Sequence, residues 1–465
     1  MRSFKTRLAA WTTLVVCLTA LAGCKYFHGE DRPTPLPAGV HPDSLIDADQ
    51  DEKSKDFFEA GGTFKSLEEL GLRVQKQKVD KLREIEKETG VQSERYDSLL
   101  ISGGAVYGAY SAGVLCGWSD ADKKPEDGGR PHFSVVTGIS TGAIIAPYAF
   151  LGKSSDADLR RVYTTIATKD VFERRRGIRG ILSESAVDNA PLRRRVDQEV
   201  TYEMMALIAA EHDKRRRLYI GTTNLDTRRL VVWDIGAIAK KGRPQDRQLI
   251  VDVILASAAI PAVFPSVRFN VEIDGQPFEE LHVDGGVTRS VFYRSPTLEP
   301  SRINAGDPDL LFAGSNVFVL VAGKMYLDPD GVRARTIAVA GASISSLLHA
   351  ETRAELYRIY TLCILTGMNF WVSAIPPELP VPEVSTNFDP VEMGRMFEEG
   401  YRLGRQGAFS AGPKNTLKAG PAWDTVPPEL RTNEMTRART GLQLKVKKPE
   451  DEKPALGPPA AGGAP

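Results

Sequence analysis

Residues 133–146 read FSVVTGISTGAIIA. The first five residues of this stretch predict a short buried strand, and the last four predict the start of a helix. Ser140 therefore lies at a strand-to-helix turn inside the pattern G-x-S-x-G, which is typical of a nucleophile elbow. Such a turn exposes the serine hydroxyl, and Gly138 and Gly142 leave room where the helix crosses the strand. Taken alone, the pentapeptide also fits an ordinary turn with a chance serine.

A second stretch, at residues 98–115, reads SLLISGGAVYGAYSAGVL. Its first four residues predict a strand and its last seven a helix, with a glycine-rich loop between them. The backbone N–H groups of such a loop can bind an anion. A dinucleotide phosphate is one candidate, although Ala105 breaks the pattern G-x-G-x-x-G and no clear ribose-binding acid follows. The other interpretation is an oxyanion hole for the serine, with the N–H groups of Gly103, Gly104 and Ala105 as donors.

A third stretch, at residues 280–286, reads ELHVDGG and places Asp284 at the end of a predicted strand. Gly285 and Gly286 let other groups approach that carboxylate closely. In this order, the three stretches resemble the patatin-like phospholipase family. In that family a glycine-rich oxyanion loop precedes a G-x-S-x-G serine and then a D-G-[GA] aspartate.

Residues 222–227 (TTNLDT) and 256–265 (ASAAIPAVFP) match two further segments of that family. The resemblance covers about residues 95–325, roughly half of the chain. It implies an α/β fold of three layers, α/β/α, around a mainly parallel central sheet. It also implies a phospholipid or other fatty-acyl ester as the substrate, and a reaction that requires no metal or cofactor.

The resemblance also implies a role for each motif residue. Ser140 would attack the ester carbonyl as the nucleophile, and Asp284 would accept the serine proton as the general base. Because these two residues are far apart in the chain, we expect them to meet as two strand ends at one edge of a parallel sheet. Five glycines belong to the motifs around them: Gly108, Gly138, Gly142, Gly285 and Gly286.

Two positions depart from the family pattern. Ala105 stands where the family usually has a third glycine, and Tyr107 stands where it usually has arginine or lysine. If the backbone at Ala105 has a positive φ, alanine costs on the order of 1 kcal/mol relative to glycine. These departures leave open a second class of function, in which an inactive patatin-like protein serves as a tethered scaffold or binding protein.

A Ser-Asp-His triad of the α/β-hydrolase type is the competing enzyme hypothesis. The chain has 6 histidines, and only His349 follows Asp284. His349 lies in the middle of a predicted apolar helix, where a single histidine more often has a structural role. His282 precedes Asp284 by two residues, so along a strand both side chains point the same way. We therefore favour a Ser-Asp pair over the triad.

The N-terminus resembles the export signal of a bacterial lipoprotein. Residues 1–23 combine a basic start with an apolar run too short for a comfortable membrane span, and the sequence LAGC then ends at Cys24. Cys24 would carry the acyl chains that anchor the protein to a membrane. An ordinary secretory signal with a chance cysteine is the alternative. Lys25 follows instead of the aspartate associated with inner-membrane retention, so we expect anchoring in a Gram-negative-type cell envelope, at the outer rather than the inner membrane.

The rest of the chain divides into segments of different character. We predict a tether at 24–62, a helical strut at 63–94, the catalytic core at 95–325, a C-terminal helical part of the same domain at 326–412, and a poorly ordered tail at 413–465. Helical patterns run over residues 331–372 and 390–409, and the segments 218–226 and 229–234 predict a hairpin.

Composition bears on the partners of the protein. The chain of 465 residues has 60 Lys+Arg and 60 Asp+Glu, which gives no electrostatic reason to expect nucleic acid. Three runs of three arginines, at 174–176, 193–195 and 215–217, could meet anionic lipids, but we expect solvated faces balanced by acids. Cys116 and Cys363 are predicted to be buried free thiols, and no Cys/His spacing suggests a metal site.

Overall fold

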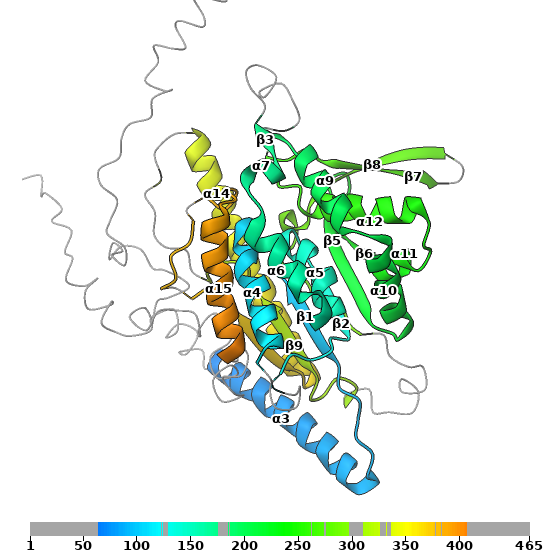
Figure 1. The fold of residues 1–465 in the computed structure, drawn as a ribbon. Helices are drawn as coiled ribbons and strands as arrows, with labels where there is room; N and C mark the ends of the chain where they lie inside the picture. The colour runs from blue at the N-terminus through cyan, green and yellow to red at the C-terminus, as the bar shows by residue number, and fades with distance from the viewer. Residues whose placement is uncertain are drawn as a thin grey trace, which may run out of the picture.

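The computed structural model describes residues 64–121, 123, 129–174, 185, 187–261, 263–273, 276–296, 310–325, 332, 336–376, 378–382 and 384–406. Helices cover both faces of a central sheet (Figure 1). The predicted three-layer α/β/α fold with a mainly parallel sheet is therefore confirmed. The predicted signal peptide, Cys24, the tether and the C-terminal tail lie outside the described residues.

The strands of the central sheet are β1 (Asp97–Ile101), β2 (Val135–Gly138), β5 (Arg217–Asn224), β6 (Arg229–Asp234), β7 (Val267–Ile273), β8 (Gln276–Asp284), β9 (Asn316–Leu320) and β10 (Asn369–Ser373). Among the described residues, their order is β10-β9-β1-β2-β5-β8-β7, and β6 also pairs with β5. β10, β9, β1, β2 and β5 run parallel, whereas β6 and β8 run antiparallel to β5. β5 and β6 form the predicted hairpin. Two short strands, β3 (Glu173–Arg174) and β4 (Val187–Asp188), pair separately.

Along each strand, side chains point alternately to the two faces of the sheet. One of these faces packs on the larger group of helices. Leu99 and Ile101 of β1 face these helices, and Leu100 faces the opposite layer. Cys116 lies in the core on the same face as Leu99, and Cys363 lies in the core on the same face as Leu100. Both are buried free thiols, as predicted. The helices are α4 (Gly108–Ser119), α5 (Thr141–Leu151), α6 (Asp156–Thr165), α7 (Thr168–Val171), α9 (Ala190–Glu199), α10 (Tyr202–Asp213), α11 (Ile235–Ala239), α12 (Pro244–Ser257) and α15 (Pro390–Gln406). Short 3₁₀ turns are η2 (Ala105–Tyr107), η4 (Lys153–Ser155) and η5 (Gly285–Val287).

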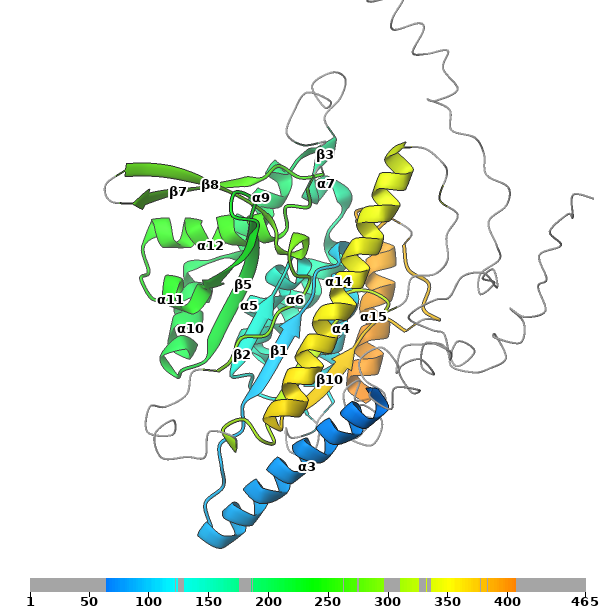
Figure 2. The ribbon, with the colours of Figure 1, turned by 180° about the vertical axis from the view of Figure 1, so that it is seen from behind.

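The opposite face is covered by the long helix α14 (Thr336–Thr366) (Figure 2). Leu356 and Ile359 of this helix are buried with Leu100 and Val317 of the sheet. The predicted strut is the helix α3 (Phe64–Thr89), which packs against α14. The second layer therefore combines two helices that are far apart in the sequence.

The C-terminal part of the domain is not only helical, contrary to the prediction for residues 326–412. The helix predicted over 331–372 ends at Thr366, and Gly367 follows with a φ of 79°. Glycine adopts this left-handed conformation at helix ends without steric cost. The next residues form β10, an edge strand that pairs with β9. The apolar run continues through both elements, which is why its periodicity alone did not separate helix from strand.

The arginine runs show how the charged surface is balanced. Arg193 of α9 binds Asp252 at 2.7 Å, and Arg216 binds Glu211 at 2.7 Å. These pairs agree with the prediction of faces balanced by acids rather than free basic patches. Within the part of the chain that the structure describes, no helix combines the length and apolarity needed to cross a membrane.

Candidate active site

Ser140 occupies a sharp turn between β2 and α5, as the G-x-S-x-G pattern predicts. Its backbone has a φ of 55° and a ψ of −123°, a conformation that strains any residue other than glycine. A Cβ added at Gly138 would lie 2.3 Å from the carbonyl oxygen of Gly142. A Cβ added at Gly142 would lie 2.3 Å from the carbonyl oxygen of Ile101. Close backbone packing at the elbow therefore requires both glycines.

Ser257, the last residue of α12, holds this strained turn. The Ser140 N–H donates a hydrogen bond of 3.0 Å to the Ser257 hydroxyl oxygen. That hydroxyl in turn donates a bond of 2.7 Å to the carbonyl oxygen of Gly221 in β5. Ser257 is fully buried, so water does not compete for either bond. Sequence reasoning placed Ser257 in a family-like segment but gave it no role.

Asp284 ends β8 and is buried beside the serine. The Ser140 side chain lies near the Asp284 carboxyl and acts to lower its pKa. The Gly286 N–H donates a hydrogen bond of 2.7 Å to the Asp284 Oδ1 atom. Burial raises the pKa of Asp284 to about 6, while Ser140 and the Gly286 N–H act in the opposite direction. The carboxyl is thus largely ionised at neutral pH and lies beside the serine side chain.

The two side chains meet by a different route from the one predicted. β8 runs antiparallel to β5, so Asp284 does not end a parallel strand. Gly138 of β2 pairs with Ile220 of β5, and Asp284 pairs two residues further on, with Thr222. Because β6 pairs along the other edge of β5, β2 and β8 share one edge and point toward each other. Their ends meet at the level of Ser140.

The glycine-rich loop after β1 lies against the serine. A Cβ added at Gly103 would lie 3.1 Å from the Ser140 Cβ atom. The Gly103 N–H donates to the Ser290 carbonyl oxygen at 3.0 Å, so it does not face an oxyanion, contrary to the prediction. For the N–H groups of Gly104 and Ala105, no acceptor is present among the described residues. These two amides are the donors that remain for an anion beside the serine.

Both remaining donor positions have a positive φ, of 156° at Gly104 and 48° at Ala105. A Cβ added at Gly104 would lie 1.9 Å from the carbonyl oxygen of Ala322, so only glycine fits there. Ala105 does occupy the left-handed region, at a cost on the order of 1 kcal/mol relative to glycine. Ala105, which departs from the family pattern, therefore occupies a strained backbone position, and its N–H group remains available as a donor.

Thr141 adds an amide that sequence reasoning did not single out. It is the first residue of α5, and none of the described residues accepts a hydrogen bond from its N–H. The helix N-terminus also contributes partial positive charge at this point. The Thr141 hydroxyl contacts the Tyr163 hydroxyl at 2.5 Å. Gly108 provides the space, because a Cβ there would lie 2.2 Å from Thr141 Oγ1. The position of Thr141 directly after the serine could have indicated this role, because the residue after a nucleophile often supplies an oxyanion donor.

Tyr107, which stands in place of the family's cation, ties the loop to the C-terminal part of the chain. Its hydroxyl donates to the Pro382 carbonyl oxygen at 2.7 Å. The Val106 N–H donates to the Ser385 carbonyl oxygen at 3.1 Å. The segment between β10 and α15 therefore packs on the glycine-rich loop from outside.

The described histidines do not complete a triad, since none of them hydrogen-bonds to Ser140 or Asp284. His349 of α14 contacts the Lys324 carbonyl oxygen at 2.9 Å, and burial lowers its pKa. His282 contacts Thr222 Oγ1 at 2.9 Å and Glu280 Oε2 at 3.2 Å. The described residues also contain no cluster of three or more His, Cys, Asp or Glu side chains that could hold a metal ion.

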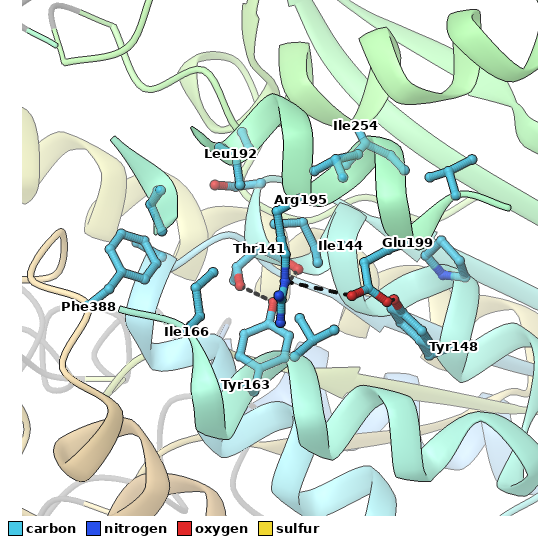
Figure 3. A pocket seen from close by; sticks show the side chains of 18 of the residues that line it. Thr141, Ile144, Tyr148, Tyr163, Ile166, Leu192, Arg195, Glu199, Ile254 and Phe388 are labelled. Atoms are coloured by element: carbon cyan, nitrogen blue, oxygen red, sulfur yellow. Dashed lines mark hydrogen bonds and ion pairs between the residues drawn. The ribbon is translucent and has the colours of Figure 1, made fainter. Parts of the chain in front are cut away.

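An apolar pocket opens beside Ser140 (Figure 3). Ser140, Thr141 and Ala105 line its reacting end. Most of the wall is aliphatic or aromatic and comes from helices far apart in the sequence, with Ile144, Val162, Leu192, Ile254, Phe264 and Phe388 as examples. Such a wall suits an apolar ligand whose polar end reaches the serine.

One charged group interrupts this wall. The Tyr148 hydroxyl donates to the Glu199 carboxylate at 3.0 Å, and Arg161 binds the same carboxylate with two bonds of 2.8 Å. Arg195 Nε lies 3.7 Å from it (Figure 3). Burial acts to raise the pKa of Glu199, but the bonds from Arg161 and Tyr148 leave it below its usual value. The carboxylate is therefore ionised and already occupied by these partners.

A known protein family matches the part of the sequence that contains this site. The sequence model of the family described as Patatin-like phospholipase matches residues 99–296, which include both Ser140 and Asp284. No curated protein matches the chain. Among solved structures, VipD from Legionella pneumophila is similar, at 12% identity over 68% of this chain and 67% of that chain, with a TM-score of 0.28. The chain therefore carries a patatin-like phospholipase domain at residues 99–296.

Proposed function

We propose that this domain hydrolyses the fatty-acyl esters of phospholipids or related lipids with Ser140 and Asp284 as a catalytic pair. The family match supports lipid acyl-ester hydrolysis in the broad sense. The observation that carries the finer proposal is the position of the buried Asp284 carboxyl beside the Ser140 side chain, which acts to lower its pKa. A buried carboxylate beside a serine hydroxyl is the arrangement that general-base activation of a nucleophile needs.

In the first half of the reaction, Ser140 Oγ attacks the ester carbonyl carbon while the Asp284 carboxylate accepts the hydroxyl proton. The free N–H groups of Gly104, Ala105 and Thr141 stabilise the oxyanion that develops. When the carbon–oxygen bond to the leaving alcohol breaks, Asp284 returns the proton to that alcohol. The products are the alcohol and an acyl-serine whose chain lies in the apolar pocket.

In the second half, Asp284 accepts a proton from water as the water oxygen attacks the acyl-serine. The same N–H groups stabilise the second oxyanion. Collapse of this intermediate releases the fatty acid, and Asp284 returns its proton to Ser140. The pair is then in its starting state, with every proton accounted for by protein groups and water.

The proposal includes a lipid anchor at Cys24 that holds the protein at the outer membrane. It is supported by the LAGC sequence at residues 21–24 and the basic and apolar segments before it. Cell fractionation tests it: the wild-type chain should sediment with outer membranes, and Cys24→Ala should not. Recovery of both proteins in the same fraction would remove this part of the proposal.

Release of fatty acid from phospholipid by the purified protein tests the reaction. Ser140→Ala and Asp284→Asn should each lower kcat by at least about 1000-fold, as removal of members of a catalytic unit does. Ser154→Ala, an exposed serine-to-alanine change, is the matched control and should keep wild-type activity. A folded wild-type protein with no turnover would favour the scaffold hypothesis. His349→Ala should also stay near wild type, and a loss as large as that of Ser140→Ala would restore the triad.

A further inference from the structure

The N-terminal half of α14 has no charged residue, and most of its described side chains are exposed. Residues 336–350 read TIAVAGASISSLLHA and contain no Asp, Glu, Lys or Arg, whereas residues 351–366 contain four such residues. Ile344 is 58% exposed and Leu347 is 69% exposed, and Leu348 beside them is also exposed. These positions are spaced three and four residues apart, so they share one side of the helix. Clustered aliphatic side chains on a projecting helix mark a contact surface.

The two halves of α14 differ in what they contact. In the C-terminal half, Leu356, Ile359 and Cys363 are buried against the sheet. The N-terminal half extends past the end of α15 beside it, toward the end of the molecule at which β1 ends (Figure 2). Because the parallel strands lead to the candidate active site at that end, the exposed half lies on the active-site side of the molecule.

Hydrogen bonds tie the middle of α14 to the glycine-rich loop. Glu351 Oε2 accepts the Ser290 N–H at 2.8 Å, and the Ser290 carbonyl oxygen accepts the Gly103 N–H at 3.0 Å. A second link joins Arg289 and Glu355 at 3.0 Å. Leu347 precedes Glu351 by about one helical turn. The exposed aliphatic side chains therefore lie about one turn from the residue that is joined, through Ser290, to the loop beside the serine.

We propose that the N-terminal half of α14 is a docking helix that rests on a lipid membrane surface and presents the active site to its substrate. This inference rests on the proposed function, since a lipid hydrolase must meet a bilayer. A helix side with Ile and Leu and no charge enters the boundary between headgroups and acyl chains. Arg333 and Arg335 directly precede the uncharged run in the sequence, and their charge complements anionic headgroups. The run itself offers no ion-pair partner to a folded protein, which favours lipid as the occupant.

An environment-sensitive label tests contact with lipid directly. Nitrobenzoxadiazole attached at Leu347→Cys, in the full chain with Ser140→Ala, should gain fluorescence severalfold when vesicles of phosphatidylcholine and phosphatidylglycerol are added. Leu365→Cys is the matched control, because Leu365 is a 57% exposed leucine of the same helix, about 27 Å further along it. Its label should not respond. No gain at position 347, or an equal gain at position 365, would overturn the proposal.

Fluorescence of the label in buffer without vesicles distinguishes lipid from two other possible occupants of the helix, another segment of this chain and a second copy of it. If another segment of this chain covers the helix, emission at position 347 is already high without vesicles and does not depend on protein concentration. If a second copy covers it, emission rises with protein concentration. Either result contradicts lipid docking. Since the Ser140→Ala background has no nucleophile, these readings do not depend on turnover, so failure of docking and failure of the proposed reaction are distinguishable.

Kinetics test the consequence for catalysis. Ile344→Ser combined with Leu347→Ser should lower turnover of phospholipid vesicles about tenfold or more, because two aliphatic side chains no longer enter the lipid. Hydrolysis of the soluble ester p-nitrophenyl butyrate should stay within about twofold of wild type. An unchanged vesicle rate would overturn the proposal. So would an equal change in both rates, which would make the helix part of the active site itself.

Discussion

Two turns beside the candidate active site each hold a residue other than glycine at positive φ. Ser140 follows β2 with a φ of 55°, and Ala105 follows β1 with a φ of 48°. In the proposed reaction the Ser140 side chain forms the acyl bond, so glycine cannot replace it. At Ala105 only the backbone N–H is needed, and glycine would supply it equally well. The strain at the elbow is therefore required by the chemistry, whereas the strain in the loop is merely tolerated.

The surroundings of the two turns differ as well. Ser140 is held by β2, which pairs with β5, and by Ser257, and all of these lie within the matched region 99–296. The loop is held by Ala322, which abuts Gly104, and by the segment that receives the Tyr107 hydroxyl. These last contacts come from beyond the matched region. The nucleophile is thus positioned by the domain itself, while the oxyanion donors depend on the C-terminal part of the chain.

Gly104→Ala should give the largest effect of the changes to the loop. The new Cβ would lie 1.9 Å from the Ala322 carbonyl oxygen, so the loop must move and carry its free N–H groups away from the serine. We expect kcat on a soluble ester to fall about 100-fold to 1000-fold, as for loss of an oxyanion donor. Gly323→Ala is the control, because no atom lies within 4 Å of its added Cβ. Near-normal kcat in Gly104→Ala would show that the loop does not serve the reaction.

The pH dependence of catalysis and of stability tests the proposed role of Asp284 beside the Ser140 turn. Asp284 acts as a base only when ionised, and its pKa is about 6, so kcat/KM should fall about tenfold per pH unit below pH 6. The stability of the folded state should instead decrease as the pH rises. Because burial raises this pKa above its unfolded value, the stabilising contribution of the protonated carboxyl is present at low pH and is lost as pH rises through 6. Asp284→Asn should remove that slope from the free energy of unfolding, and an unchanged slope would place the titration elsewhere.

Ser257→Ala should have a moderate effect at the elbow. It leaves the buried Ser140 N–H and Gly221 carbonyl without their partner, which costs about 1–3 kcal/mol of stability. We also expect kcat to fall about tenfold because the strained turn loses its support. Ser185→Ala, which removes a buried 2.8 Å bond to the Val187 carbonyl, is the matched control and should change thermal unfolding but not kcat. Equal kcat in both variants would mean that Ser257 only stabilises the fold.

Ala105→Gly should give the smallest effect. Relief of the left-handed strain is worth about 1 kcal/mol, but the greater freedom of glycine in the unfolded chain offsets most of it. We expect unfolding free energy within about 1 kcal/mol of wild type and kcat within about threefold. Ala105→Val should be clearly worse in both assays, since β-branched residues avoid this φ. A large loss in Ala105→Gly would show that the methyl group has a role of its own.

The elbow and the fold class could be predicted from local sequence. The glycines at 138 and 142 and the apolar runs around them specify a strand, a turn and a helix with few alternatives. The loop after β1 could be located for the same reason, and Ala105 could be identified as a position where the sign of φ matters.

The remaining features depend on contacts between distant segments. The antiparallel direction of β8 follows from pairing with β5, which no short pattern encodes. The loss of Gly103 as a donor depends on the Ser290 carbonyl, and the support of Ser140 depends on Ser257. The pocket wall combines several helices. Apolar periodicity also could not separate α14 from β10, because the apolar run continues through both elements.

Reaction with a fluorophosphonate, located by mass spectrometry of the digested protein, tests the central claim most directly. The account predicts a single phosphonylated peptide, with the added mass on Ser140, in the wild-type protein. Asp284→Asn should react at least about 100-fold more slowly, because the serine loses its base. A well-folded wild-type protein that never reacts, or one that reacts at another serine while Ser140 stays unmodified, would contradict the account.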